Sequence, residues 1–243
     1  MNKRNYDKES VELNEKKYNY NFDSIVREYM FRTWSKYLTD GAALEVGCYH
    51  GDSTVILKSK FNDLTVVEPS MECIKIAKQK VGNDVVFIHD VAENINSEKK
   101  FDHIFLVNTL EHCDDPAKLL NSIKKMLAKK GRLYVLVPNA DAPSRVIAAF
   151  MGVVDFSTAV TPAEYIHGHR RTYSFDILNK DIVSSGFSII DRGGIIYKGL
   201  ANYQMDLALE NKIINSSYIE ACYQYGLMYA HQTASLFVVA ECK

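Results

Sequence analysis

The chain lacks the sequence features of membrane-spanning and secreted proteins. No apolar run approaches the roughly 20 residues that a helix needs to cross a bilayer, and the first residues, MNKRNYDKESVELNEKKYNYNFD, contain no apolar signal-peptide core. The five cysteines are dispersed, odd in number and include no CxxC pair, which disfavours a disulfide framework and a structural zinc site. We therefore expect a cytoplasmic protein with no membrane partner.

The chain also has almost no net charge. Its 29 basic and 30 acidic side chains give a formal net charge of -1, whereas a nucleic-acid-binding protein needs a concentrated basic face. One short stretch gathers Lys124, Lys125, Lys129 and Lys130, but such a group is typical of a solvated helix face. We expect no nucleic-acid partner.

Short apolar runs alternate with amphipathic segments along most of the 243 residues. After a helix at 22–38, this pattern predicts strands at 42–46, 64–67, 85–88, 101–107, 133–137, 187–191 and 235–240. Helices are predicted at 53–60, 71–81, 116–128 and 174–185, and Gly131 marks the end of the third of these. The alternation predicts an α/β fold, with a mostly parallel sheet and helices on both faces.

No linker or internal repeat divides the chain, so we expect a single domain over residues 1–243. Residues 1–40 would form an N-terminal helical cap, of which the charged part up to about residue 17 would be loosely ordered. Insertions on the acceptor side are expected near 140–172 and 193–232. The second is rich in tyrosine, and its helical spacing is typical of a core or a subunit contact, which leaves a homodimer open.

A glycine turn follows the first predicted strand. Gly47 lets the backbone approach a ligand, and Gly51 permits a tight turn into the next helix, whose first amides then face the ligand. Glu45 is placed to balance the ammonium group of an amino-acid moiety. A GxGxxG motif would need glycine at Tyr49 and Asp52, so the turn disfavours a nicotinamide dinucleotide.

An acidic residue, Glu68, ends the second predicted strand. At that place a carboxylate can accept hydrogen bonds from both hydroxyls of a ribose. Because nicotinamide enzymes place an acid similarly, Glu68 alone does not separate the two kinds of cofactor.

These segments resemble the successive motifs of class I S-adenosylmethionine (SAM)-dependent methyltransferases. The motifs are Glu45-Val-Gly-Cys-Tyr-His-Gly51, Val67-Glu-Pro69, Phe87-Ile-His-Asp90 and Phe101-Asp-His-Ile-Phe-Leu-Val-Asn-Thr-Leu-Glu-His112, and the resemblance covers about 42–243. It implies SAM as cofactor and a Rossmann-like sheet of six parallel strands plus an antiparallel last strand. It also implies that the cofactor is bound by Glu68 and Pro69 at the ribose, Asp90 and the Val91 amide at the adenine, and Asn108 near the methionine part. The chain departs from the usual ExGxGxG at Tyr49, where a tyrosine would narrow the pocket or cover the cofactor.

Later segments resemble a narrower bacterial subgroup that we associate with small-molecule or sugar-linked acceptors. They are Pro138-Asn-Ala-Asp-Ala-Pro-Ser-Arg145, His167-Gly-His-Arg-Arg-Thr-Tyr173 and the stretch 193–204. The groups predicted to bind the acceptor are Asn139, Arg145, Arg170, Arg171, Lys198 and Gln204.

A hydroxyl acceptor needs a general base, and a histidine suits that role at neutral pH. His167 and His169 are the main candidates, with Arg170 or Arg171 holding acceptor charge. His112 is a third candidate, although Glu-His at this point accompanies many different acceptors and so favours a structural role. Hard oxygen ligands of the kind Mg²⁺ prefers follow two strands, but their number and spacing match a magnesium site poorly, and we expect no metal.

The sequence thus predicts methyl transfer from SAM to a hydroxyl of a small polar acceptor, such as a phosphorylated or nucleotide-linked sugar in a surface-polysaccharide pathway. One alternative is N-methylation of a small amine or amino sugar, which needs alignment more than a base. Another is a SAM-binding protein without catalysis.

Overall fold

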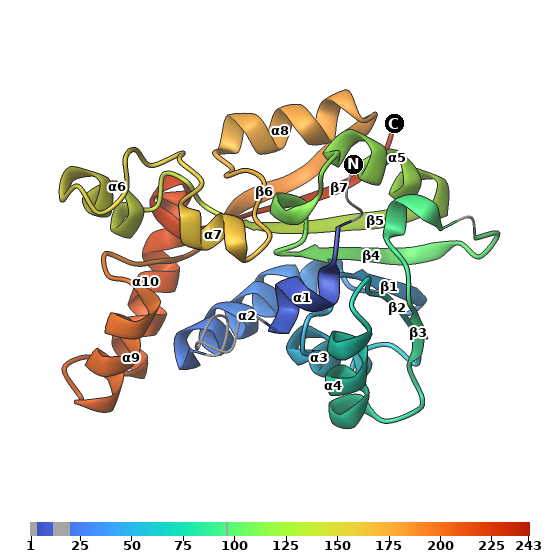
Figure 1. Cartoon of the computed structure of the whole chain (residues 1–243), viewed down its shortest axis with the longest axis horizontal. Coiled ribbons are helices and arrows are strands. Elements are labelled where there is room, and N and C mark those ends of the chain that lie inside the picture. The colour runs from blue at the N-terminus through green and yellow to red at the C-terminus, as the bar shows by residue number, and fades with distance from the viewer. Residues whose placement is uncertain (1–3, 12–19, 96) are drawn as a thin grey trace.

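The computed structural model describes residues 4–11, 20–95 and 97–243, and a single seven-stranded sheet runs through it (Figure 1). The strand order is β3-β2-β1-β4-β5-β7-β6. The strands are β1 (Ala42–Val46), β2 (Asp63–Val67), β3 (Val86–Ile88), β4 (Phe101–Val107), β5 (Leu127–Pro138), β6 (Phe187–Tyr197) and β7 (Thr233–Cys242). Only β7 runs antiparallel to its neighbours β5 and β6. The predicted Rossmann-like sheet, six parallel strands with an antiparallel last strand, is confirmed.

Helices cover both faces of this sheet (Figure 1). The α-helices are α1 (Tyr6–Val11), α2 (Asn21–Trp34), α3 (Asp52–Lys58), α4 (Met71–Val81), α5 (Pro116–Met126), α6 (Pro143–Phe150), α7 (Pro162–Ile166), α8 (Phe175–Ser184), α9 (Asn202–Glu210) and α10 (Ser216–Met228). Single 3₁₀ turns are η1 (Ser35–Tyr37), η2 (Ala92–Asn94), η3 (Leu110–His112) and η4 (Ala230–Gln232). Within the described ranges, no helix is long and apolar enough to cross a membrane.

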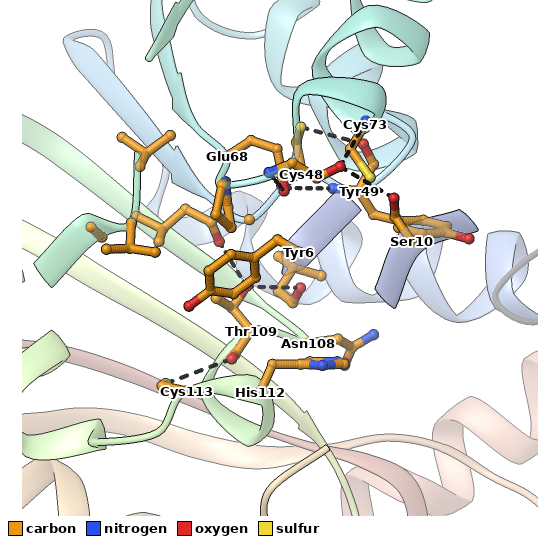
Figure 2. Close-up of a pocket in the computed structure, with 18 of the residues that line it drawn as sticks. Tyr6, Ser10, Cys48, Tyr49, Glu68, Cys73, Asn108, Thr109, His112 and Cys113 are labelled. Atoms are coloured by element: carbon orange, nitrogen blue, oxygen red, sulfur yellow. Dashed lines mark hydrogen bonds between the residues drawn. The ribbon is translucent and has the colours of Figure 1, made fainter. Parts of the chain in front are cut away.

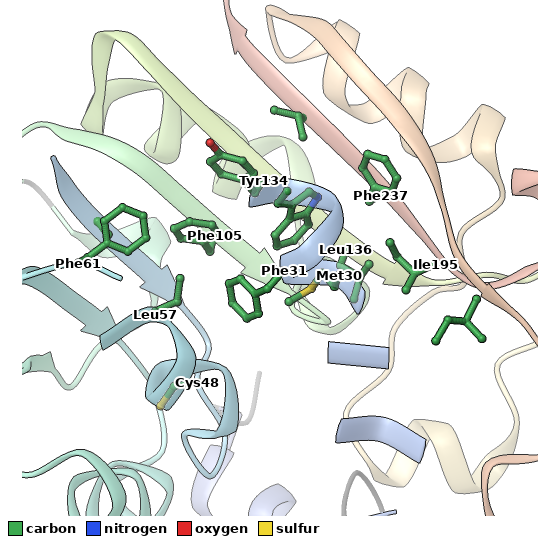
Figure 3. Packing of buried hydrophobic residues seen from close by; sticks show 14 of the residues in the cluster. Met30, Phe31, Cys48, Leu57, Phe61, Phe105, Tyr134, Leu136, Ile195 and Phe237 are labelled. Atoms are coloured by element: carbon green, nitrogen blue, oxygen red, sulfur yellow. The ribbon is translucent and has the colours of Figure 1, made fainter. Parts of the chain in front are cut away.

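The central strands are buried on both faces, because successive side chains of a strand point to opposite sides. Phe105 of β4 packs with Phe31 and Trp34 of α2 on one face (Figure 3). Its neighbour Leu106 packs on the other face, in the cluster formed by α5 and α8. This double burial explains the unbroken apolar runs by which the strands were predicted.

The helix predicted at 116–128 ends earlier than expected. It stops at Met126, and Gly131 lies inside β5 rather than at the end of the helix. The register between β4 and β5 shifts after Phe101 pairs with Leu127. A Cβ at position 131 would lie 2.8 Å from the carbonyl oxygen of Phe101, so the glycine permits close strand packing here.

The predicted insertion at 193–232 also begins later than expected. Residues 193–197 belong to β6, where Gly193 pairs with Phe237 and Tyr197 pairs with Thr233. A Cβ on Gly193 would lie 2.6 Å from the ring of Phe237. Gly193 therefore makes room for a neighbouring side chain inside the sheet, whereas the sequence predicts that the strand has ended before it.

The N-terminal segment contains a short helix, α1, so the prediction of loose order is wrong for residues 6–11. The rest of that prediction falls mostly on residues 1–3 and 12–19, which lie outside the described residues. The α1 helix packs against α4 (Figure 1). Asp7 fixes it there, since its Oδ1 accepts a hydrogen bond from Ser70 Oγ at 2.8 Å.

Candidate cofactor and acceptor site

The main cavity lies at the carboxyl ends of β1, β2 and β4, where ligands bind in open α/β sheets. Figure 2 shows its wall, to which the turn after β1 contributes Cys48 and Tyr49, β2 contributes Glu68, and the segment after β4 contributes Asn108. The crossover order of the sheet brings these turns together at one edge. The cavity therefore gathers the residues of the methyltransferase-like motifs.

The turn after β1 has three residues with positive φ: Gly47 (77°), Tyr49 (47°) and Gly51 (82°). A Cβ on Gly47 would lie 2.9 Å from Thr109 Oγ1, which donates a hydrogen bond to the Val46 carbonyl at 2.7 Å. Tyr49 thus adopts the left-handed conformation that a glycine favours, and its ring stacks on His50 with the centroids 3.7 Å apart. A non-glycine residue thus occupies a left-handed position in this turn.

Glu68 holds this turn in place. Its Oε2 accepts hydrogen bonds from the amides of Cys48 (2.9 Å) and Tyr49 (3.1 Å), and its Oε1 accepts one from the amide of Ser70 (2.9 Å). The side chain is 6% exposed. Burial raises the pKa of Glu68, and the three amides oppose that rise. Glu68 and Pro69 both line the cavity, so a ribose contact is compatible with this arrangement.

Asn108 offers an unpaired acceptor at the wall of the cavity. It follows β4 with a φ of 51°, and its amide donates to the Leu136 carbonyl at 2.9 Å. Its Oδ1 is buried and has no hydrogen-bond partner. Because buried acceptors are normally satisfied, this oxygen suits a donor on a ligand, such as the ammonium group of a methionine moiety.

Glu45 lies behind the turn and is not among the residues that line the cavity. It is fully buried, and its Oε2 accepts a hydrogen bond from Thr54 Oγ1 at 2.6 Å. Burial raises the pKa of Glu45 to about 8. The carboxyl therefore holds its proton at pH 7 and lies behind the wall, so the balance of an ammonium group by Glu45 stays a prediction. Arg27 of α2, which the sequence analysis did not single out, does line the cavity.

Part of the cavity wall is apolar at the place where the resemblance implies adenine. Val91 and Ala92 after β3 line it together with Leu119 of α5. Asp90 does not line the cavity, and its Oδ1 accepts a hydrogen bond from the Val91 amide at 2.7 Å. The amide predicted to meet adenine is therefore engaged by Asp90 in this structure, and the adenine contacts of both residues stay a prediction.

The predicted histidines divide between two pockets. His112 and His167 line the main cavity, whereas His169 lines a smaller pocket beside it, together with Glu111, Asn139, Arg145 and Arg171. The rings of His112 and His169 meet edge to face, with their centroids 4.6 Å apart. Burial lowers the pKa of His112 well below its usual value, and the neighbouring His169, Arg4 and Arg170 lower it further.

Two residues predicted to bind acceptor have side chains that are already engaged. Asn139 Nδ2 donates to the carbonyls of His231 (2.9 Å) and Thr233 (2.8 Å). Arg145 forms a two-pronged ion pair with Glu164, with Nη1–Oε1 at 2.6 Å and Nη2–Oε2 at 3.1 Å. Burial alone would raise the pKa of Glu164, but the Arg145 hydrogen bonds lower it to about 2. These contacts hold loops together around the smaller pocket.

The remaining four predicted acceptor contacts lie outside the main cavity. Arg170 pairs with Asp114 and Glu9, both at 3.2 Å, and Arg171 Nη2 donates to the Asp114 carbonyl at 3.0 Å. Lys198 donates to Asn202 at the start of α9, and burial lowers its pKa to about 8. At the same helix start, Gln204 Oε1 accepts a hydrogen bond from the Ala201 amide at 2.9 Å.

Part of the wall comes from α1 and the residues before it, which sequence reasoning missed. Arg4, Tyr6, Glu9 and Ser10 line the cavity. Arg4 joins two distant segments, since its Nη1 donates to the His112 carbonyl at 2.6 Å and its Nη2 to the Gly168 carbonyl at 3.1 Å. No apolar periodicity marks this segment, and its many charges led us to expect loose order instead of a wall of the cavity.

Comparisons with known proteins agree with this geometry. Residues 22–190 match the family model described as a methyltransferase domain. The chain is 31% identical over 134 residues to a ubiquinone biosynthesis O-methyltransferase of Xylella fastidiosa, covering 53% of this chain and 50% of the relative. It is 38% identical over 96 residues to a malonyl-[acyl-carrier protein] O-methyltransferase of Ilyobacter polytropus, covering 37% of this chain and 35% of the relative. The chain therefore spans half or less of the length of these two relatives.

Solved structures show the same fold. A SAM-dependent methyltransferase from Thermotoga maritima superposes with a TM-score of 0.62 at 18% identity, covering 90% of this chain and 92% of that chain. The N-methyltransferase NodS of Bradyrhizobium japonicum, in complex with S-adenosylhomocysteine, gives 0.58 at 13% identity, covering 92% and 89%. The chain belongs to the methyltransferase domain family, and the prediction of a SAM-dependent methyltransferase is confirmed in family, fold and cofactor.

Proposed function

We propose that this chain transfers the methyl group of SAM to a hydroxyl oxygen of a small polar acceptor. The observation that carries the proposal is the position of two histidines, His112 and His167, on the wall of the cavity that Asn108 and Glu68 also line. A hydroxyl must lose its proton as its oxygen attacks carbon, so an acceptor of this kind needs a base beside the donor. The similarity to two O-methyltransferases supports the same reading.

SAM supplies an electrophilic methyl carbon on a positively charged sulfur. The acceptor oxygen forms the new bond to that carbon, the carbon–sulfur bond breaks with its electron pair left on sulfur, and the hydroxyl proton passes to the base. The residues of this chain mainly align the two reactants, which can lower the barrier by several kcal/mol.

We assign the base role to His167. It lines the cavity, and its Nδ1 is buried without a hydrogen-bond partner. His112 is a weaker base, because burial and neighbouring cations lower its pKa well below the usual value. His169 faces the smaller pocket.

The relatives do not support a sugar-linked acceptor, which rests only on the resemblance of later segments. Acceptor binding by Arg170 and Arg171 likewise remains a prediction, as do a cytoplasmic location and a homodimer.

The test combines cofactor binding with turnover. His167→Ala should keep SAM affinity in calorimetry, while methylation of hydroxyl acceptors, followed as a gain of CH₂ by mass spectrometry, should fall roughly 10²- to 10⁴-fold. His231→Ala is the matched control, because His231 is exposed and its side chain lies outside both pockets. Full turnover in His167→Ala would remove the base role. Turnover confined to amine acceptors would favour N-methylation, and SAM binding without turnover of any acceptor would favour a binding protein.

A further inference from the structure

Three side chains with metal-binding atoms meet between the main cavity and the smaller pocket. Glu111 and His112 belong to η3, and His169 follows α7. One ligand atom from each of the three lies within 4.8 Å of the other two. The backbone holds the two segments together, since the Arg170 amide donates to the Glu111 carbonyl at 2.8 Å.

The carboxylate of Glu111 has no partner for its charge. The residue is 1% exposed, and neither Oε1 nor Oε2 has a hydrogen-bond partner. Buried polar atoms are normally satisfied, so two oxygens without partners at this depth suit a cation that would accept their lone pairs.

The nearest arginines do not supply that cation. Arg145 is paired with Glu164, and Arg170 is paired with Glu9 and Asp114. Arg171 lines the same pocket and has a buried Nη1 without a partner, yet among the described residues it forms no ion pair with Glu111.

We propose that Glu111, His112 and His169 bind a divalent transition-metal ion. Two imidazoles and one carboxylate form a ligand set that suits Zn²⁺ and other first-row ions better than Mg²⁺. Small side-chain rotations would bring the three atoms to the roughly 2.0–2.2 Å that zinc needs. This proposal departs from the expectation, drawn from the sequence, of no metal.

The access of the site fits such an ion. The smaller pocket, lined by Glu111 and His169, gives a path from solvent. Three protein ligands leave a coordination position for water or another oxygen, and His112 places the ion beside the main cavity. The site requires neither an acceptor nor methyl transfer, so it stands apart from the proposed function.

The decisive experiment measures metal binding by the full chain after treatment with a chelator. Calorimetric titration with Zn²⁺ should show one ion per chain. Glu111→Gln and His169→Ala should each weaken binding at least 100-fold, whereas the exposed controls Glu98→Gln and His231→Ala should leave it unchanged. SAM titration of each variant shows whether it has kept its fold.

A second measurement on the unmodified chain covers the case in which a variant fails to fold. Co²⁺ in the site should give the visible absorption of a four- or five-coordinate ion with nitrogen and oxygen ligands. Three results would overturn the proposal: no Zn²⁺ binding, Zn²⁺ binding that survives both site variants, or a cobalt–thiolate band that reveals ligation by Cys113 or another cysteine.

Discussion

Replacing Glu68 should destabilise the protein even without cofactor. The carboxylate accepts hydrogen bonds from three backbone amides, two in the turn after β1 and one at the start of α4. In Glu68→Gln, the side chain keeps one oxygen, and its NH₂ group must then face at least one of those amides. The turn would lose a fixed partner before SAM arrives.

The expected magnitude follows from the lost bond. A hydrogen bond to a charged group contributes about 1.5–3 kcal/mol, and the burial that raises the pKa of Glu68 offsets part of this. We therefore expect Glu68→Gln to lower the free energy of unfolding by about 1.5 kcal/mol, with a larger loss in Glu68→Ala. Chemical denaturation without SAM measures this, and the exposed Glu28→Gln is the control.

One result would refute a structural role for Glu68. If both Glu68 variants unfold as the unmodified chain does, while SAM affinity falls, the amide bonds contribute nothing. Glu68 would then act only on the cofactor, as the family resemblance alone implies.

Three further predictions test other parts of the site. Burial raises the pKa of Glu45 to about 8, so the folded chain holds this proton over a pH range in which the unfolded chain loses it. The free energy of unfolding should therefore fall as the pH rises from about 4.5 to 8. In Glu45→Gln, denaturation at pH 5.5 and 7.5 should show a fall that is smaller by about 2 kcal/mol. Arg4→Ala removes the bonds to the His112 and Gly168 carbonyls, so calorimetry should show SAM affinity about 10-fold weaker. An unchanged affinity would show that these bonds do not shape the cofactor site. Lys198→Met should alter thermal stability but leave the KM for the acceptor unchanged, because Lys198 contacts Asn202 outside the cavity; a raised KM would restore it as an acceptor contact.

Much of the fold was predictable because its signals are local. The strands are buried on both faces, so β4 and the end of β5 appear as continuous apolar runs. The glycine turn and Glu68 follow their strands directly, and parallel strands bring such ends to one edge. Errors arose where a glycine served packing within the sheet. Gly131 and Gly193 make room for neighbouring groups in strands, whereas the sequence suggests a helix end at the first and the start of an insertion at the second.

The acceptor side was less predictable, because tertiary contacts decide whether its charged side chains are available to a ligand. Arg145 is engaged by Glu164, 19 positions along the chain, and Arg170 by Asp114, 56 positions away. Nothing near either arginine in sequence shows whether its charge is available to a ligand. The same holds for Glu111, whose depth and missing partners follow only from the packing around η3.

The wall built by α1 has a practical consequence for anyone who handles this protein. Asp7 and Ser10 contact Ser70, beside Glu68, and Arg4 reaches the far side at His112. An affinity tag or a truncation placed close to Arg4 would therefore alter the cofactor compartment itself. A tag placed after Lys243 is preferable, and rates of cofactor exchange should be compared only between proteins with the same N-terminal residues.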